Sequence, residues 1–492
     1  ADLDGVRAIR ADSKLPGFRG SDMWPLAKDK VRHVGEPIAA CVAPTRAAAE
    51  DLAEAVGLDV EPLPAVVDMR AAREPSAPLI HEHWSENVFL ESRSLGGADI
   101  ETVKAKAAVS ARLELRTARQ SMAPIEGRGT VAEWDARLGL LTLTTGQQMP
   151  HVVRSGLALC LGMEEGQVRL ISPDVGGGFG YKGILSQEDV VLGWLAIRLG
   201  RPVRWIEDRR EQLTANANCR EHWYDVTGYA SAEGDLLGIE ARAIVDAGAY
   251  SLYPFSACLE GAQVGSILPG PYDFEAFRCD AFSACTNKPG ILPYRGVART
   301  GVCFALELTM DALAQKLGME PSQFRIRNLV KPEQMPFDNV VKKHFDSGDY
   351  PEAVRRAEAA IDLAAVRARQ RAGEADGRRI GLGIAVYCEQ AAHGTSVYSG
   401  WGVPFVPGFE QATARLTPDG GLEVRVGAHS HGQGMETSLA QVANEVLGVD
   451  VQKTRIIHGD TSMTPYSTGT WGSRCGVMVG GAVATACETL AG

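Results

Sequence analysis

Four glycines crowd five consecutive positions around one aromatic residue in residues 173–183, which read PDVGGGFGYKG. Glycine tolerates a positive φ and lets a ligand approach bare backbone N–H groups. An apolar run at residues 168–171 precedes this glycine-rich loop, and a helix-like segment begins near Leu185. Such a loop suits a phosphate or another large polar cofactor.

One interpretation of this loop is a dinucleotide fold, since Gly178, Gly180 and Gly183 have the spacing G-x-G-x-x-G. Asp208 then lies at roughly the distance, about 20 residues on, expected of a carboxylate that binds ribose. Beyond it, however, the chain shows short β-rich runs separated by Gly, Asp and Asn turns, at residues 224–229, 236–245 and 277–283. These runs favour antiparallel strands over a βαβ array, so a nicotinamide-dependent dehydrogenase is only an alternative.

The composition is that of an ordinary folded protein. The chain has 492 residues, of which 45% are hydrophobic and 23% charged, enough for about 3 domains. Its net charge of −11, without any basic run, argues against nucleic-acid binding. No apolar stretch reaches about 18 residues, so we expect no membrane span and a cytoplasmic protein.

The candidate metal ligands do not form a recognisable set. The ten cysteines include no C-x-x-C pair, which is typical of reduced, buried thiols, and any redox metal cluster would lie on a partner. Two pairs of histidines are each separated by one residue, His81 with His83 and His429 with His431. Neither pair has a third or fourth candidate ligand at a spacing typical of a metal site. Hydrogen-bonded histidines are therefore favoured over a metal site. The carboxylates Glu126, Glu207 and Asp208 could act as acids or bases, but surface or capping roles are more common.

The elements that would position these residues begin with a small module at residues 1–75. It shows a strand pattern at 37–42, a helix at 46–56 capped by Thr45, and a second strand pattern at 58–60. We expect these elements to form a β-α-β unit.

A larger unit mixes strands with helices. The strands are expected at residues 109–115, 139–144 and 168–171, and the helices at 187–199 and 303–317. Pro321 then opens a further helix at its first turn, where its missing N–H costs nothing. A helical segment at 350–377 leads to a third unit, which begins at Ile380 and ends in a helical run.

Four further glycine-bearing turns carry a polar side chain between hydrophobic elements, at residues 145–148, 293–296, 431–434 and 469–474. Glutamine and arginine supply hydrogen-bond donors. Turns that met the glycine-rich loop at one cleft would therefore bind an anionic, oxygen-rich cofactor without ligating a metal. Each turn taken alone is more often an isolated turn.

The order of these loops resembles the large, molybdenum-cofactor-binding subunit of the molybdenum hydroxylases, which include xanthine dehydrogenase, aldehyde oxidoreductase and carbon monoxide dehydrogenase. The motifs are QMPH at 148–151, DVGGGFG at 174–180, PYRG at 293–296, GQG at 432–434 and GSR at 472–474. Residues 34–38 and 61–66 resemble the family's α/β-hammerhead domain. The resemblance implies an α+β fold, with an α/β-hammerhead module at 1–75 and a two-part molybdenum-cofactor-binding domain at 95–365 and 380–492. It also implies that both ends are clipped relative to the family.

The resemblance assigns a cofactor role to each motif. Gln148 would contact the apical ligand of the molybdenum, and Gly178, Phe179 and Gly180 would press backbone against the metal centre. Arg295 would line the active site from the far side. The pterin and its phosphate would be held by Gly432, Gln433, Gly434, Gly472, Ser473 and Arg474. No residue would ligate the metal directly, because the pterin holds it, and the family's general-base glutamate motif is not present in this chain.

Departures from the family pattern bear on the substrate. Val297 and Gly183 match positions that face the substrate. Gly183 stands where purine-specific members carry a glutamate, which argues against xanthine. Gly296 follows Arg295 where the best-defined carbon monoxide oxidisers carry a cysteine, which argues against that gas. Elsewhere a histidine and a proline more usual in the family are replaced by Gln120 and Gly127.

The implied activity is hydroxylation of an aldehyde or N-heteroaromatic substrate with water as the oxygen source. The molybdenum–pterin cofactor is expected as its cytosine dinucleotide. Electrons would pass to an iron–sulfur small subunit and an FAD-binding medium subunit, in a dimer of heterotrimers. The alternative from a different class is a non-catalytic scaffold subunit.

Overall fold

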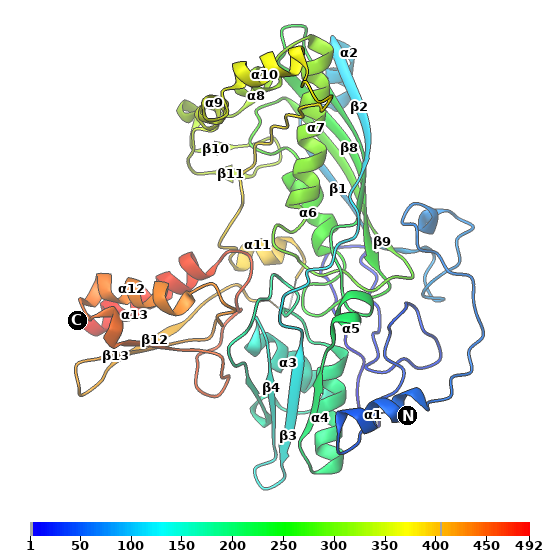
Figure 1. Cartoon of the computed structure of the whole chain (residues 1–492), viewed down its shortest axis with the longest axis vertical. Coiled ribbons are helices and arrows are strands. Elements are labelled where there is room, and N and C mark those ends of the chain that lie inside the picture. The colour runs from blue at the N-terminus through cyan, green and yellow to red at the C-terminus, as the bar shows by residue number, and fades with distance from the viewer. Residues whose placement is uncertain (1–2, 404–405) are drawn as a thin grey trace.

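The computed structural model describes residues 3–403 and 406–492; residues 1–2 and 404–405, which belong to the first and last expected units, lie outside the described part. Its described strands form three main sheets and a short hairpin (Figure 1). In Figure 1 a five-stranded sheet fills the upper part, a four-stranded sheet the lower part, and a three-stranded sheet lies to the left. The connecting loops gather in the centre between them.

The five-stranded sheet has the order β1-β9-β8-β7-β2. Its members are β1 (Val88–Gly97), β2 (Val109–Arg116), β7 (His222–Ala230), β8 (Leu236–Gly248) and β9 (Ala276–Cys285). The expectation of purely antiparallel pairing is wrong at one place, because β8 and β9 are parallel. Their connection contains α6 (Leu259–Ile267), and a connection of this length allows a crossover between parallel strands. Two further helices belong to this unit, α2 (Ile100–Lys106) and the long α7 (Arg299–Leu317).

The four-stranded sheet has the order β5-β4-β3-β6. Its members are β3 (Gly129–Asp135), β4 (Leu140–Thr145), β5 (Val168–Ile171) and β6 (Val203–Ile206), with α3 (Pro150–Leu161), α4 (Gln187–Leu199) and α5 (Arg209–Thr214). The expected strand at 168–171 and helix at 187–199 are confirmed. The helix is delimited by its own chemistry, since the Ser186 side chain caps its start and Gly200 ends it in the left-handed region.

The three-stranded sheet has the order β12-β13-β14, with strands β12 (Ala412–Leu416), β13 (Leu422–Val426) and β14 (Thr454–Ile457). It packs with α12 (Met435–Leu447) and α13 (Gly480–Ala491), which follows a π-helical turn at Cys475–Val479. These elements share a core of their own that includes Val424, Leu439 and Val483. The helical run expected at the end of the chain is confirmed.

Shorter elements join the two larger sheets to this unit. Pro321 occupies the first turn of α8 (Pro321–Asn328), as expected. The hairpin β10 (Phe337–Asp338) and β11 (His344–Phe345) follows, and then α9 (Tyr350–Ala360), α10 (Leu363–Ala372) and α11 (Thr395–Gly400). The helical segment expected at 350–377 is therefore two helices, because Asp362 has a φ of 47° and caps α10.

The first module differs from its prediction. Its helix α1 (Arg46–Glu54) is present and Thr45 caps it, but residues 37–42 and 58–60 are not strands. A strand needs a neighbour to take its backbone hydrogen bonds, and these runs pair with no strand among the described residues. Apolar side chains such as Leu58 and Val60 are consequently 58% exposed.

Candidate functional site

Gln148 joins three of the expected loops. Its side-chain oxygen accepts a hydrogen bond from the Gly180 backbone N–H at 2.9 Å, and its amide nitrogen donates to the Thr470 carbonyl at 3.0 Å. Its own backbone pairs with both neighbours, since its N–H donates to the Lys182 carbonyl and its carbonyl accepts from the Thr470 N–H. The side chain is 3% exposed. Segments 322 residues apart in sequence are thus held together by one glutamine.

The glycine-rich loop follows a backbone path that most residues avoid. Phe179 has a φ of 59° and Gly180 a φ of 114°. A Cβ atom on Gly180 would lie 1.7 Å from the Pro293 carbonyl oxygen, and one on Gly178 would lie 2.5 Å from the Gln148 side-chain oxygen. These positions therefore require glycine, because any side chain would collide with the neighbouring loops.

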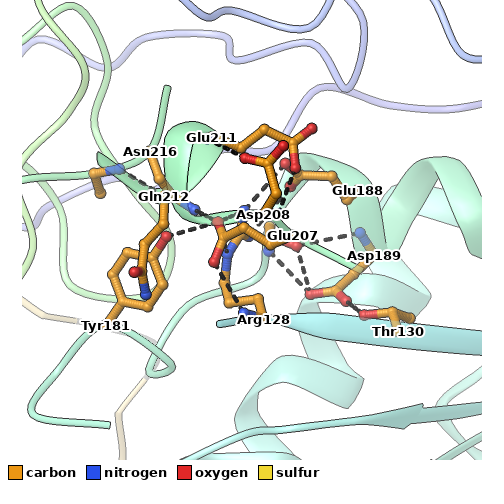
Figure 2. Close-up of polar contacts among 12 residues, drawn as sticks. Arg128, Thr130, Tyr181, Glu188, Asp189, Glu207, Asp208, Glu211, Gln212 and Asn216 are labelled. Carbon is orange, nitrogen blue, oxygen red and sulfur yellow. Dashed lines mark hydrogen bonds and ion pairs between the residues drawn. The ribbon is translucent and has the colours of Figure 1, made fainter. Parts of the chain in front are cut away.

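A buried charge cluster contacts the glycine-rich loop at Tyr181 (Figure 2). The Glu207 carboxylate accepts hydrogen bonds from the Tyr181 hydroxyl at 2.7 Å, from the Arg128 guanidinium at 3.0 and 3.1 Å and from the Asn216 amide at 3.0 Å. Arg128 also donates to both oxygens of Glu188, at 3.1 and 3.2 Å. A buried carboxylate is stable only when its lone pairs are used, so this cluster fixes the position of Tyr181.

The pKa values within the cluster follow from burial and pairing. Burial alone would raise the pKa of the Glu188 carboxyl, but the Arg128 guanidinium holds it below its usual value. Burial raises the pKa of Tyr181, which therefore acts as a neutral hydrogen-bond donor. Glu207 was expected at the surface or in a capping role, and that expectation is wrong. Its neighbour Asp208 does cap a helix, accepting from the Glu211 N–H at 2.7 Å.

This arrangement contradicts the dinucleotide alternative. A bound dinucleotide needs an open helix N-terminus for its pyrophosphate and a free carboxylate for its ribose. The start of α4 is closed by a capping box between Ser186 and Asp189. Asp208 is engaged at α5, as described, and β5 pairs in parallel with β4 alone. Gly178, Gly180 and Gly183 therefore serve the close packing of loops rather than a pyrophosphate.

Lys182 ties the other end of the glycine-rich loop. Its side chain is 1% exposed, and its ammonium group contacts the Glu126 carboxylate, which also accepts from the Gly176 N–H at 2.7 Å. Burial lowers the pKa of Lys182. Burial also lowers the pKa of the nearby His431 to about 4, with a smaller contribution from the Lys182 charge. His431 is therefore neutral, while Lys182 is paired with Glu126.

Arg295 approaches the glycine-rich loop through its backbone, since its N–H donates to the Phe179 carbonyl at 2.9 Å. Its side chain is exposed. Its carbonyl accepts from Arg220, whose guanidinium carbon lies 4.0 Å from the centre of the Tyr294 ring. Arg220 also reaches the Gln120 side chain at 3.5 Å. Gln120, where the family more often has histidine, is thus part of the support of the Arg295 turn.

The two substrate candidates, Gly183 and Val297, have different surroundings. Gly183 is buried, and a Cβ on it would lie 3.6 Å from the Phe255 ring and 3.8 Å from the Met149 sulfur. The Val297 carbonyl accepts two hydrogen bonds from Arg299, at 2.7 and 2.9 Å. The Phe255 ring packs 4.6 Å from the Trp471 ring. A Cβ on Gly183 would therefore meet the Gly180 carbonyl oxygen at 3.3 Å as well as the phenylalanine ring and the methionine sulfur.

The third unit contributes a loop at 429–434. A Cβ on Gly432 would lie 3.7 Å from the Val175 carbonyl oxygen, which places this turn beside the glycine-rich loop. Gly434 has a φ of 75° and precedes α12. The Gln433 side chain folds back onto its own turn, where it accepts from the His431 N–H at 2.7 Å. The loops expected to converge do lie together, while this side chain is engaged locally.

The last loop carries Gly472, Ser473 and Arg474. Gly472 and Ser473 have φ values of 58° and 53°. Arg474 is fully buried and pairs with the equally buried Glu410, whose pKa is raised by that burial. Its Nε and Nη2 atoms find no acceptor among the described residues. Arg474 therefore retains unused donors next to the Gly472 turn.

Direct metal ligation has no candidates in the described part of the chain. Over residues 3–403 and 406–492, no group of three or more His, Cys, Asp or Glu side chains could hold a metal ion. All ten cysteines lie in this part; they are free thiols, and six of them are buried. Within the same residues, no helix has the length and apolar character needed to cross a lipid bilayer.

Comparison with known protein families shows the family to which this chain belongs. Residues 80–329 match a family model described as a molybdopterin cofactor-binding domain, and residues 356–492 match a second model with the same description. The first match alone covers more than half of the chain. The chain belongs to the large-subunit family of the molybdenum hydroxylases. The resemblance, the α+β fold and the two-part cofactor domain predicted from the sequence are confirmed.

Known members of the large-subunit family are similar over almost all of this chain. The nicotine 6-hydroxylase large subunit of Paenarthrobacter nicotinovorans is 35% identical over 98% of the chain and 59% of its own length. The carbon monoxide dehydrogenase large chain of Hydrogenophaga pseudoflava is 32% identical over 97% of the chain and 61% of its own length. The crystal structure of quinoline 2-oxidoreductase from Pseudomonas putida 86 superposes with a TM-score of 0.94 at 34% identity, over 99% of the chain and 62% of that structure. The chain therefore spans about three fifths of the length of these relatives.

Several supporting residues of this large-subunit site could not be found from the sequence. Tyr181 directly follows the DVGGGFG motif, but its partner Glu207 lies 26 residues later in the sequence. Arg128 lies 79 residues before Glu207. The Arg220 guanidinium donates to the Arg295 backbone carbonyl, and the Thr470 backbone carbonyl accepts from Gln148, so in each contact one partner is a backbone group. A left-handed φ at Arg220, 61°, has no signal in the residue type.

Proposed function

We propose that this chain is the molybdenum-cofactor-binding catalytic subunit of a hydroxylase that acts on a flat N-heteroaromatic substrate or an aldehyde. The observation that carries the proposal is that four of the motif loops meet at Gln148 and Phe179–Gly180, while the fifth lies with Gly432 beside Val175 of the glycine-rich loop, in a chain of the molybdenum hydroxylase family. When bound, the molybdenum–pterin group supplies two-electron oxidation of an electron-poor carbon with oxygen taken from water.

The residues present fit such a group. At Gly180 the glycine-rich loop approaches the Pro293 carbonyl so closely that there is no room for a side chain. The Gly180 backbone itself therefore faces the neighbouring loop. Gln148 uses its oxygen for Gly180 and one amide proton for Thr470, so one amide proton is left for a ligand. Arg474 has unused Nε and Nη2 donors, which suit an oxygen-rich group. These residues would hold the cofactor by hydrogen bonds, as a pterin-held metal requires.

The remaining motif residues complete the proposed binding site. Gly178, Phe179 and Gly180 would lie against the metal centre, and Arg295 would line the far side. The turns Gly432–Gln433–Gly434 and Gly472–Ser473 would present backbone N–H groups to the pterin and its phosphate. The Ser473 backbone supports this role, since a positive φ of 53° at a non-glycine residue is the kind of strain that clusters at ligand sites.

The substrate class is proposed from two positions. Gly183 leaves no carboxylate to bind a purine, and Val297 offers an apolar side chain. The relatives named for nicotine and quinoline support a heteroaromatic ring. The same proposal includes the cytosine dinucleotide form of the cofactor, iron–sulfur and FAD partner subunits, and a dimer of heterotrimers. It also includes a hammerhead role for residues 1–75 and a cytoplasmic location.

The test is metal analysis of the complete complex that contains this chain, purified with its partner subunits. We expect molybdenum and a pterin nucleotide, and oxidation of N-heteroaromatic compounds with ¹⁸O incorporated from labelled water. Gln148→Ala should lower the amount of bound molybdenum at least about tenfold. Its control is Gln187→Ala, which removes a glutamine that bonds the Trp24 carbonyl away from the loops. A complex that folds without molybdenum would instead support the scaffold alternative.

A further inference from the structure

Four groups form a continuous hydrogen-bonded chain between the third unit and the glycine-rich loop. The His429 Nε2 atom lies 2.9 Å from the Pro173 carbonyl oxygen, and its Nδ1 lies 2.8 Å from the Nδ1 of His458. The His458 Nε2 lies 3.0 Å from a carboxylate oxygen of Glu436, in the first turn of α12. We call this chain, from Pro173 through His429 and His458 to Glu436, the imidazole clasp.

The clasp requires one proton more than two neutral imidazoles carry. A carbonyl and a carboxylate only accept, so the contacts to Pro173 and Glu436 each need a proton on a ring nitrogen. The contact between the two Nδ1 atoms needs a third proton. Two neutral rings supply only two protons. All three hydrogen bonds can therefore exist together only while the clasp holds one additional proton.

Other charged and titratable groups act on the clasp. Burial lowers the pKa of His429 to about 4, helped by His458 and His431, whereas Glu436 opposes that shift. His458 contacts the Glu436 carboxylate directly, while His431 faces the Lys182 charge. His458 therefore lies between the Glu436 carboxylate and a neutral His429 that points its own proton at Pro173.

The clasp is placed where it can control the loops of the site. Pro173 is the first residue of the glycine-rich loop, and the His429 N–H also donates to the Thr470 hydroxyl at 3.0 Å. The adjacent Ser172 N–H donates to the Gly459 carbonyl at 2.6 Å, next to His458. A Cβ on Gly459 would lie 2.8 Å from the His429 Nδ1, so the rings are closely packed.

We infer that His429 and His458 are positioning residues that hold the glycine-rich loop against the third unit, and that the hold is complete only while the clasp keeps its additional proton. Loss of that proton as pH rises must break one of the three hydrogen bonds. The inference rests on the proposed function, because the consequence of a loosened loop is a loosened cofactor.

The experiment uses the complete, cofactor-loaded complex, incubated between about pH 6 and about pH 9. Released molybdenum is measured in the filtrate, and released pterin by its fluorescence after oxidation. The wild type should release cofactor about tenfold faster at the alkaline end. His458→Gln has no ring proton to lose, so its release should be fast at both ends and independent of pH. His344→Gln is the matched control, since His344 pairs with Asp338 at 2.8 Å on the exposed β11 hairpin and should leave the wild-type profile unchanged.

The outcomes separate the two proposals. No molybdenum in the wild-type complex at any pH would count against the proposed function. Bound molybdenum that His458→Gln releases with the wild-type rate and pH profile would overturn the clasp alone. If His458→Gln does not assemble, a neutron structure of the wild-type complex near pH 7 decides, because we expect three hydrogens on the four ring nitrogens and two would contradict the inference.

Discussion

The Tyr181 hydroxyl donates a 2.7 Å hydrogen bond to the buried Glu207 carboxylate, and this contact ties the glycine-rich loop to a charge cluster at the start of β3 and the end of β6. Tyr181 is two residues from Phe179, the residue expected to face the metal centre. The position of the loop therefore depends on a buried ion pair, Arg128 with Glu207.

Removing this hydroxyl should loosen the loop without unfolding the unit. Tyr181→Phe leaves Glu207 with its bonds to Arg128 and Asn216, so we expect a cost of about 1–2 kcal/mol and a measurable loss of bound molybdenum. Metal content and thermal unfolding of the complex are the measurements. Tyr229→Phe, which removes a similar bond to Glu240 on the five-stranded sheet, is the control and should retain full metal content.

Gly180 should tolerate no side chain. Gly180→Ala would place a methyl group 1.7 Å from the Pro293 carbonyl oxygen at a φ of 114°, so two backbone segments would have to separate. We expect a loss of about 3 kcal/mol or more and no bound cofactor. Gly166→Ala has nothing within 4 Å of its added methyl group and should behave as wild type. A Gly180→Ala complex with normal metal content would show that the loop does not pack as described.

Asp208 should matter for stability alone. Asp208→Ala removes the N-cap of α5, which should cost about 1 kcal/mol while the cofactor content stays unchanged. Equilibrium unfolding and metal analysis measure the two effects. Nicotinamide binding to the wild type that disappears in this variant would restore the dinucleotide interpretation.

A second charge cluster predicts the response of the protein to acid. Hydrogen bonds from Lys288, Arg116 and Arg119 outweigh the burial of Glu221 and lower its pKa to about 2. A carboxyl with a lowered pKa contributes stability that is present above its unfolded value near 4.5 and is lost as pH falls towards about 2. Unfolding measured from pH 6 downwards should show this loss.

The matching variant is Glu221→Gln, which leaves Arg119 and Lys288 with Asp246 as their remaining carboxylate. It should cost about 1–3 kcal/mol at neutral pH and should flatten the dependence on acid. An acid profile as steep as that of the wild type would mean that other carboxylates control it.

The sequence allowed prediction of those elements that carry their own boundary signals. The helix Gln187–Leu199 has a serine cap before it and a glycine after it, and both act within one turn. The convergence of the loops at Gln148 was predictable from donor residues on glycine turns together with the family resemblance. The parallel pairing of β8 and β9 was not, because strand direction depends on where the chain returns after α6. Glu207 was misjudged because only the folded chain brings Arg128 and Tyr181 to it.

The hydrogen bond between Gln148 and Thr470 has a consequence for biosynthesis. The two residues are separated by 322 positions, so a ribosome that adds about 5–20 residues per second needs roughly 16–64 s to make the second after the first. Throughout that interval Gln148 can bond Gly180 and Lys182 but lacks its partner Thr470. The full set of contacts around Gln148 therefore exists only after the last loop has been translated.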